Sequence, residues 1–188
     1  MSAILLTPPA AEPWTVAEAK DFLRVEHSED DAIVAALVAA ARSHVEALTR
    51  RALLTQVWRF MLDAWPARGR FVPRMAPLRE VTAARVYDAA GVAGAVDAGS
   101  FVVDAAANII AVPSGALPMP GRGTAGIELD VQIGYGAADD VPENLRHAVR
   151  MLAAHWYENR GLAAFGASVA VLPAGAAALL APYRVLSL

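Results

Sequence analysis

The chain has 188 residues, with 16 Lys and Arg against 19 Asp and Glu, so its formal net charge is −3. This length suffices for one domain, or for a domain with an insertion. Proteins that grip nucleic acid through its phosphates are usually basic, so the charge argues against that class, though not against a protein that surrounds DNA. There is no cysteine, which excludes disulfides, thiolate metal sites and cysteine nucleophiles.

Two helices are predicted in the first part of the chain. Thr15 followed by Glu18 is a capping-box pattern and predicts a helix over residues 16–25. Ser28 is the predicted N-cap of a second, longer helix with an acidic first turn. Its apolar stripe is expected to contain Ile33, Leu37, Ala41, His44 and Leu48, widened by Val34, Val38 and Val45.

Residues 55–137 alternate between apolar and polar side chains, which predicts strands. Strands are expected at the segments around 56–62 and 81–87, and a hairpin is expected around Asn108. The clearest alternation lies in "IELDVQI", with Ile127, Leu129, Val131 and Ile133 on one side and Glu128, Asp130 and Gln132 on the other. A run of short strands with turn residues between them favours an antiparallel sandwich or barrel for this stretch.

A third helix and an apolar tail complete the chain. Asp140 with Glu143 forms a second capping-box pattern, Pro142 lies in the first turn, and Gly161 marks the end of the helix. Residues 161–183 carry no charge and are long enough to span a bilayer. They are mostly Ala and Gly, however, so we expect a tail covered by a partner and no membrane span.

The predicted fold class is α+β. Residues 1–54 are expected to supply N-terminal helices, 55–137 an inserted antiparallel β unit, and 138–161 a C-terminal helix that packs on the first helices. Together these make a small helical bundle interrupted by strands. Residues 162–188 are expected to form an extended apolar tail that docks on a neighbour.

No candidate chemistry outweighs a structural interpretation. In "HAVRMLAAHWYENRG" (147–161), His147 and His155 lie about 80° apart around a helix and about 12 Å apart along it, so one ion cannot bind both. His44 lies on an apolar stripe, where a packed histidine is more common than a general base. The glycine-rich "GRGTAG" (121–126) precedes a strand, so phosphate binding at a helix start is not expected. We predict no catalytic, cofactor or metal site.

Four segments carry a resemblance to a known family. They are 14–66, which includes "AKDFLRV" and "DDAIVAALVAAARSHVEALTRRALLTQVW"; "APLREVTAARVYDAAG" (76–91); "IGYGAADDVPENLRHAVRMLAAHWYENRG" (133–161); and "LPAGAAALLAPYRV" (172–185). Their order and spacing resemble the phage head–tail connector family, also called adaptor or head-completion proteins. The resemblance covers nearly the whole chain.

The resemblance implies a structural subunit with no catalytic residues. It implies a ring, generally of twelve copies, beneath the portal protein of a tailed phage, a prophage or a gene transfer agent. The implied location is the head–tail junction of the particle, which assembles in the bacterial cytoplasm. The implied partners are the portal, the neighbouring copies, a tail-side stopper or tail-completion protein, and DNA that passes through the channel without sequence-specific binding. No membrane partner is implied.

We expect the C-terminal tail to contact the portal. "ASVAVL" (167–172) has the composition to add as a strand to a partner's sheet. The expected anchors are Phe165, Val169, Val171, Leu172, Leu179, Leu180 and Tyr183. Two other functions stay open: a protein-binding adaptor of the same fold outside any phage, and an enzyme whose pocket would join a histidine to a carboxylate.

Overall fold

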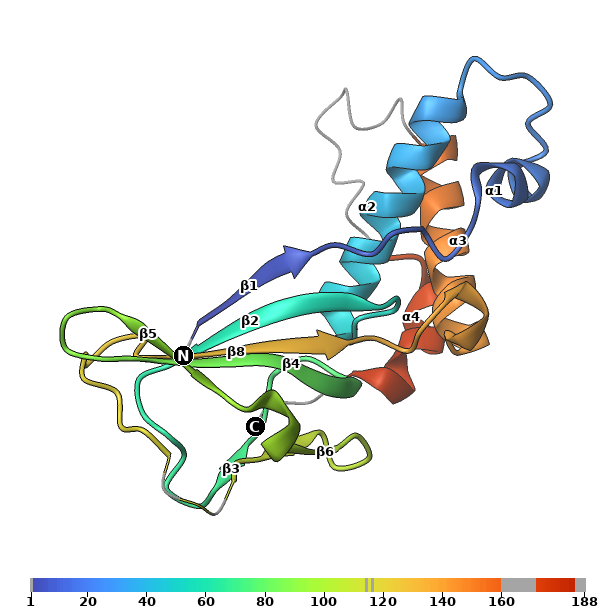
Figure 1. Ribbon diagram of the computed structural model, residues 1–188. Coiled ribbons are helices and arrows are strands. Elements are labelled where there is room, and N and C mark those ends of the chain that lie inside the picture. The colour runs from blue at the N-terminus through green and yellow to red at the C-terminus, as the bar shows by residue number, and fades with distance from the viewer. Residues whose placement is uncertain (1, 114, 116, 160–171, 185–188) are drawn as a thin grey trace. The chain divides into compact units, whose positions relative to one another are not determined.

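The computed structural model describes residues 2–113, 115, 117–159 and 172–184 (Figure 1). The chain divides into two compact units. Residues 1–10 and 55–134 form the first, here called the sheet unit, and residues 11–54 and 135–188 form the second, here called the helical unit. The fold class is α+β, as the sequence predicts.

The main sheet of the sheet unit has five antiparallel strands in the order β1-β2-β8-β4-β5. These strands are β1 (Ser2–Thr7), β2 (Gln56–Leu62), β4 (Leu78–Tyr87), β5 (Ala93–Val96) and β8 (Ile127–Ile133). β8 is central, between β2 and β4 (Figure 1). Its alternating residues Ile127, Leu129, Val131 and Ile133 are fully buried, which confirms the predicted inward face.

A second, smaller sheet contains β3 (Arg70–Phe71), β6 (Val102–Asp104) and β7 (Ile109–Ala111), in the order β3-β7-β6. A short 3₁₀ turn, η1 (Ala98–Ser100), precedes β6. Asn108, with φ 56°, closes the predicted hairpin between β6 and β7. The rings of Phe60 in β2 and Phe71 in β3 meet edge to face with centroids 5.5 Å apart, so aromatic packing joins the two sheets.

Strand β1 was not predicted. The sequence assigned residues 1–54 to helices alone, whereas Ser2–Thr7 pairs with β2 at the edge of the main sheet. Ile4, Leu5 and Leu6 of this strand are exposed. Since neither face of the strand is covered, its side chains do not alternate between apolar and polar, and the pattern that reveals the other strands is missing.

The helical unit contains α1 (Val16–Leu23), α2 (Asp31–Thr49), α3 (Glu143–Glu158) and α4 (Ala174–Leu180), with 3₁₀ turns η2 (Ala138–Asp140) and η4 (Ala181–Tyr183). Helices α2 and α3 make the most extensive helix–helix contact (Figure 1). The buried stripe of α2 is Val34, Val38, Ala41, Val45 and Thr49. The predicted Ala41 and the flanking Val34, Val38 and Val45 are thus buried, whereas Ile33, also predicted on the apolar stripe, is 43% exposed.

Among the described helices, α2 is long and apolar enough to cross a membrane by length and composition. Its Val34, Val38 and Val45 side chains lie instead in the core of the helical unit, together with Leu145 and Leu152 of α3. Burial in this core accounts for the buried apolar stripe of α2, as in the core helix of a folded domain.

Two of the three predicted helix caps differ from the structure. The capping box of Thr15 and Glu18 is confirmed. The N-cap of α2 is Asp30 and not Ser28. Helix α3 begins after Pro142, while Asp140 lies in η2, where its carboxylate accepts from Ala137 N at 2.9 Å. Pro142 itself occupies the N-cap position, with ψ 131°, and no side chain caps the helix.

The described part of the C-terminal segment is helical, which corrects the prediction of an extended tail. Helix α4 packs on α3, and its Ala176 and Leu180 are fully buried. Ala and Leu have high helix propensity, and Pro173 lies at the N-cap, so the sequence favours a helix once Leu180 has a surface to pack on.

Candidate functional site

The histidines singled out in the sequence lie in separate environments. His44 packs edge to face against Trp156, with ring centroids 5.8 Å apart. The ring of His147 is 2.9 Å from the Arg150 guanidinium, measured from Nδ1 to Nη2. His155 lies 3.2 Å from the amide of Asn159 on the next turn of α3. Each histidine thus has a local structural contact, and Glu158 joins none of them.

Within the described ranges, no group of three or more His, Asp or Glu side chains gathers closely enough to hold a metal ion. His147 and His155 lie two helical turns apart on α3, as the sequence spacing requires. The glycine-rich residues 121–126 form a loop before β8 and are not followed by a helix.

A stack of arginine and indole groups joins the N-terminal segment to α3. The guanidinium carbons of Arg146 and Arg150 lie 4.3 Å and 4.5 Å from the centre of the Trp14 ring. Trp14 Nε1 donates to the carbonyl oxygen of Arg146 at 2.7 Å, and Arg150 also lies over the Phe22 ring at 4.5 Å. These contacts bind α1 to α3 through cation–π attraction as well as burial.

The outward face of β2, β8 and β4 carries a network of two arginines and two carboxylates. Arg59 Nε donates to Asp130 Oδ1 at 2.6 Å, and Arg85 Nη1 donates to Asp130 Oδ2 at 2.8 Å. Glu128 Oε2 lies 3.2 Å from Arg59 Nη1. Glu128 and Asp130 are buried by these neighbours, although they occupy the polar side of β8.

The network changes the pKa values of its members. The hydrogen bond from Arg59 to Asp130 raises the pKa of Arg59 above its ordinary value. Burial alone would raise the pKa of Asp130, but the hydrogen bonds from Arg59 and Arg85 outweigh burial and lower it. Both groups are therefore charged at neutral pH, and the ion pairs are part of the folded state.

A second network ties the N-terminal segment of the helical unit to α2. Arg42 Nε donates to Glu12 at 2.7 Å, and Arg42 Nη1 donates to Glu46 at 2.7 Å. Glu46 Oε1 also accepts from the backbone N–H of Leu53 at 2.8 Å, beyond the C-terminus of α2. Burial would lower the pKa of Arg42, but these carboxylates raise it.

Three of the predicted portal anchors, Phe165, Val169 and Val171, lie outside the described residues. Leu172, Leu179 and Tyr183 are half-buried against the core of the helical unit. The Tyr183 ring lies 5.7 Å from the Arg51 guanidinium. Leu180 is fully buried in its own chain, so in this conformation its side chain holds α4 in place and presents no surface to a partner.

The ion networks were not predicted, yet the sequence contains a partial signal. Asp130 and Glu128 were assigned correctly to the polar side of β8, and Arg59 and Arg85 occur on the alternating strands β2 and β4. Only the register, which pairs Arg59 with Asp130 and Arg85 with Glu128, shows that they meet. Strand register depends on contacts between residues far apart in the chain, so it could not be read from one segment.

Comparison with known proteins identifies the family. The family model for phage gp6-like head–tail connector proteins matches residues 122–184. A chain from a solved structure of the neck of an empty gene transfer agent (GTA) particle, computed with C6 symmetry, is 31% identical with a TM-score of 0.83. The match covers 100% of this chain and 97% of that chain. This chain belongs to the phage head–tail connector family.

Two further solved structures agree with this connector along its whole length. A chain from the virion of a native gene transfer agent particle is 31% identical with a TM-score of 0.82. A chain from the neck of a native GTA particle, computed with C12 symmetry, is 32% identical with a TM-score of 0.79. Each match covers 100% of this connector and 97% of the other chain. No curated protein sequence matches.

Membership in a structural family explains the polar residues of α3. The connector role is not enzymatic, and His147 and His155 belong to α3, a helix that packs in the core of the helical unit, with Asn159 as its C-cap. The predicted resemblance to head–tail connectors is confirmed by the family model and by the solved necks.

Proposed function

We propose that this connector is a subunit of a ring, of twelve copies, at the head–tail junction of a phage or phage-like particle. In that position it would join the portal to the tail-side stopper or tail-completion protein. It would also surround the DNA that passes through the channel, without sequence-specific binding.

The observation that supports this proposal most directly is the match over the full chain to neck subunits at 31–32% identity. Those necks were computed with six-fold and twelve-fold symmetry. A ring with a rotation axis requires each subunit to offer two different surfaces to its two neighbours. The net charge of −3 is compatible with a channel wall that does not hold DNA tightly.

We further propose that the portal binds the C-terminal segment. Phe165, Val169 and Val171 supply apolar side chains to this contact, and Leu172, Leu179 and Tyr183 supply the parts of their side chains that the core of the helical unit leaves uncovered. Leu180 contributes indirectly, since its burial positions α4.

The test is to mix the connector with its cognate portal and to measure the mass and negative-stain images of the mixture, beside the connector alone. The expected result is a ring docked on the portal, with a mass increase that fits twelve copies. A connector that stays monomeric and does not bind the portal would contradict the proposal, and would favour an adaptor module of the same fold that acts outside a particle.

A further inference from the structure

The basic residues of the sheet unit are concentrated in one segment. The sheet unit has as many basic as acidic residues, so the negative net charge of the connector comes from the helical unit. Between Asp63 and Glu80, however, the chain carries arginines and no carboxylate. These arginines are Arg68, Arg70, Arg74 and Arg79. Such segregation is uncommon in a unit without net charge, and it suggests an oppositely charged partner.

Between residues 70 and 74 the side chains alternate between the core and solvent. Phe71 and Pro73 are buried, whereas Arg70, Val72 and Arg74 are exposed. Every second side chain therefore still points outward beyond the two residues of β3, as far as Arg74. Along an extended chain, Arg70 and Arg74 are about 13 Å apart, with Val72 between them.

Hydrogen bonds hold this segment in place. The turn before β3 is closed by Gly69, whose N–H donates to the carbonyl oxygen of Pro66 at 2.8 Å. The Gly69 carbonyl in turn accepts from Val112 N at 2.9 Å, and the carbonyl oxygen of Pro73 accepts from the side chain of Asn108 at 3.0 Å. The arginines thus project from a fixed backbone, which lowers the entropy lost when a partner binds.

Apolar side chains share the outward face with the arginines. The register of the small sheet places Arg70 opposite Ala111, and Ala111 opposite Val102. Val72 is 57% exposed and Val102 is 67% exposed. We call the surface formed by Arg68, Arg70, Val72, Arg74 and Val102 the arginine face. Apolar residues mixed with arginine are typical of protein–protein interfaces and less so of a surface that contacts only phosphates.

Most carboxylates of the sheet unit are engaged in contacts other than ion pairs with these arginines. Apart from Glu80, each accepts a backbone N–H in a turn or pairs with Arg59 or Arg85. These carboxylates are Asp63, Asp88, Asp97, Asp104, Glu128 and Asp130. Among the described residues, Arg68, Arg70 and Arg74 form no ion pair. These exposed arginines are therefore available to pair with carboxylates of a partner.

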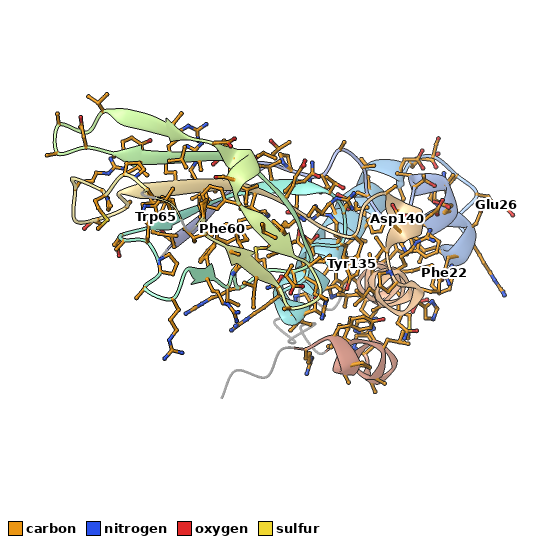
Figure 2. All side chains as sticks on the ribbon, turned by 60° about the horizontal axis from the view of Figure 1, so that its bottom comes forward. Phe22, Glu26, Phe60, Trp65, Tyr135 and Asp140 are labelled. Atoms are coloured by element: carbon orange, nitrogen blue, oxygen red, sulfur yellow. The ribbon has the colours of Figure 1, made fainter. Side chains whose placement is uncertain are left out.

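The helical unit carries a surface of matching composition. Residues 24–30 link α1 to α2, and within this link Glu26 and Glu29 are exposed, with Glu29 Oε2 2.8 Å from His27 Nδ1. On either side of this acidic link, Phe22 and Ile33 are each 43% exposed. Phe22 and Glu26 lie at the same end of the helical unit (Figure 2). We call the surface formed by Phe22, Glu26, Glu29 and Ile33 the acidic end.

We propose that the arginine face of one copy packs against the acidic end of the next copy around the ring. The inference rests on the proposed ring, in which each interface joins two different surfaces of the same chain. The two surfaces are opposite in charge, and each places exposed apolar side chains beside the charges, so contact would bury apolar area and pair the arginines with carboxylates.

Cysteine cross-linking tests the contact without background, because the connector has no cysteine of its own. One chain would carry Val72→Cys together with Ile33→Cys and would be assembled on the portal and then oxidised. The expected product is a ladder of covalent oligomers, whereas each single variant gives no ladder. The matched control combines Ile33→Cys with Val92→Cys, another exposed valine of the sheet unit that lies outside the arginine face.

The outcomes separate this inference from the proposed function. Rings on the portal that give no ladder would overturn the interface and leave the ring proposal standing. The absence of rings, seen by imaging of the unmodified connector, would contradict the ring proposal and the interface together. A ladder of equal strength from the Val92→Cys control would show non-specific contact and would also overturn the interface.

A charge exchange provides a second test. Arg70→Glu with Arg74→Glu should weaken ring assembly by about tenfold or more, since like charges would face each other. Adding Glu26→Arg and Glu29→Arg to the same chain should restore assembly, because every interface again pairs opposite charges. If the first pair leaves the ring intact but the particles lose DNA, the arginine face contacts DNA, and the inference is wrong.

Discussion

Single side chains fix the position of the central strands and of the N-terminal segment. The carboxylate of Asp130 accepts hydrogen bonds from Arg59 on one neighbouring strand and from Arg85 on the other. It therefore joins three strands on the face opposite the apolar core. In the helical unit, Trp14 plays a similar part, because two arginines of α3 cover its ring and so hold the N-terminal segment against α3. Both contacts link segments that are far apart in the sequence.

Asp130→Asn should lower the free energy of unfolding at pH 7 by about 1–3 kcal/mol, because two charge-assisted hydrogen bonds lose their charged acceptor. The pKa of Asp130 is lowered in the folded chain from an ordinary value of 3.8. The unfolded chain therefore binds the proton more readily, so the stabilisation is present above about pH 4 and is lost as the pH falls through the lowered pKa.

Urea denaturation at a series of pH values measures this effect. The unmodified connector should lose more stability between about pH 4 and about pH 2 than the Asp130→Asn variant, which has no carboxyl group to titrate at this position. Glu80→Gln, an exposed carboxyl on the same sheet, is the matched control and should keep the steep pH dependence. Equal slopes for the connector and the Asp130→Asn variant would contradict the role of the network.

Helices and strands with one buried face could be predicted from the sequence. Those whose structure depends on contacts with residues far away in the chain were missed. The alternation in β8 was visible because one of its faces lies in the core. Strand β1 was missed, since "SAILLT" lies at an edge where both faces are exposed. Helix α4 was taken for an extended tail because its Ala- and Gly-rich sequence has no charged face, and only packing on α3 shows which side is buried.

Leu180→Ala tests whether α4 is part of the folded helical unit. Leu180 is fully buried, so the substitution should remove buried apolar contacts and lower the free energy of unfolding by about 2–5 kcal/mol. Leu179→Ala is the matched control: this side chain is only half-buried, and its loss should be clearly smaller. Thermal unfolding followed by circular dichroism measures both, and an unchanged Tm for Leu180→Ala would show that α4 is not anchored on α3.

In the whole molecule, exposed arginines and exposed carboxylates, each beside apolar side chains, lie on different units. This division suits a ring subunit, which must offer two different surfaces to its neighbours. The sheet unit is neutral in total, and Arg68, Arg70 and Arg74, which form no ion pair within the part of the chain that the structure describes, lie in one segment of it. The helical unit carries the excess of carboxylates. Neither feature was recognised from the composition alone, because the net charge of −3 averages over both units. The resemblance to connectors was recognised from the order of the motifs. The arginine face and the acidic end could be recognised only from the exposure of side chains and the register of strands in the structure.

The portal contact can be separated from folding by comparing two kinds of variant. Phe165→Ala with Val169→Ala removes two proposed portal anchors, and should weaken binding to the portal by about tenfold or more while the Tm stays unchanged. Leu180→Ala should instead lower the Tm, and should weaken portal binding only near the temperature at which α4 loses its packing. Binding is measured by biolayer interferometry with immobilised portal. If the variant with Phe165→Ala and Val169→Ala binds the portal as tightly as the unmodified connector, the portal contact does not involve these two residues, which lie between α3 and α4 in the sequence. Loss of binding on substitution of the half-buried Leu172 and Tyr183, which lie on either side of α4 in the sequence, would then place the contact on the segment that packs against the core of the helical unit.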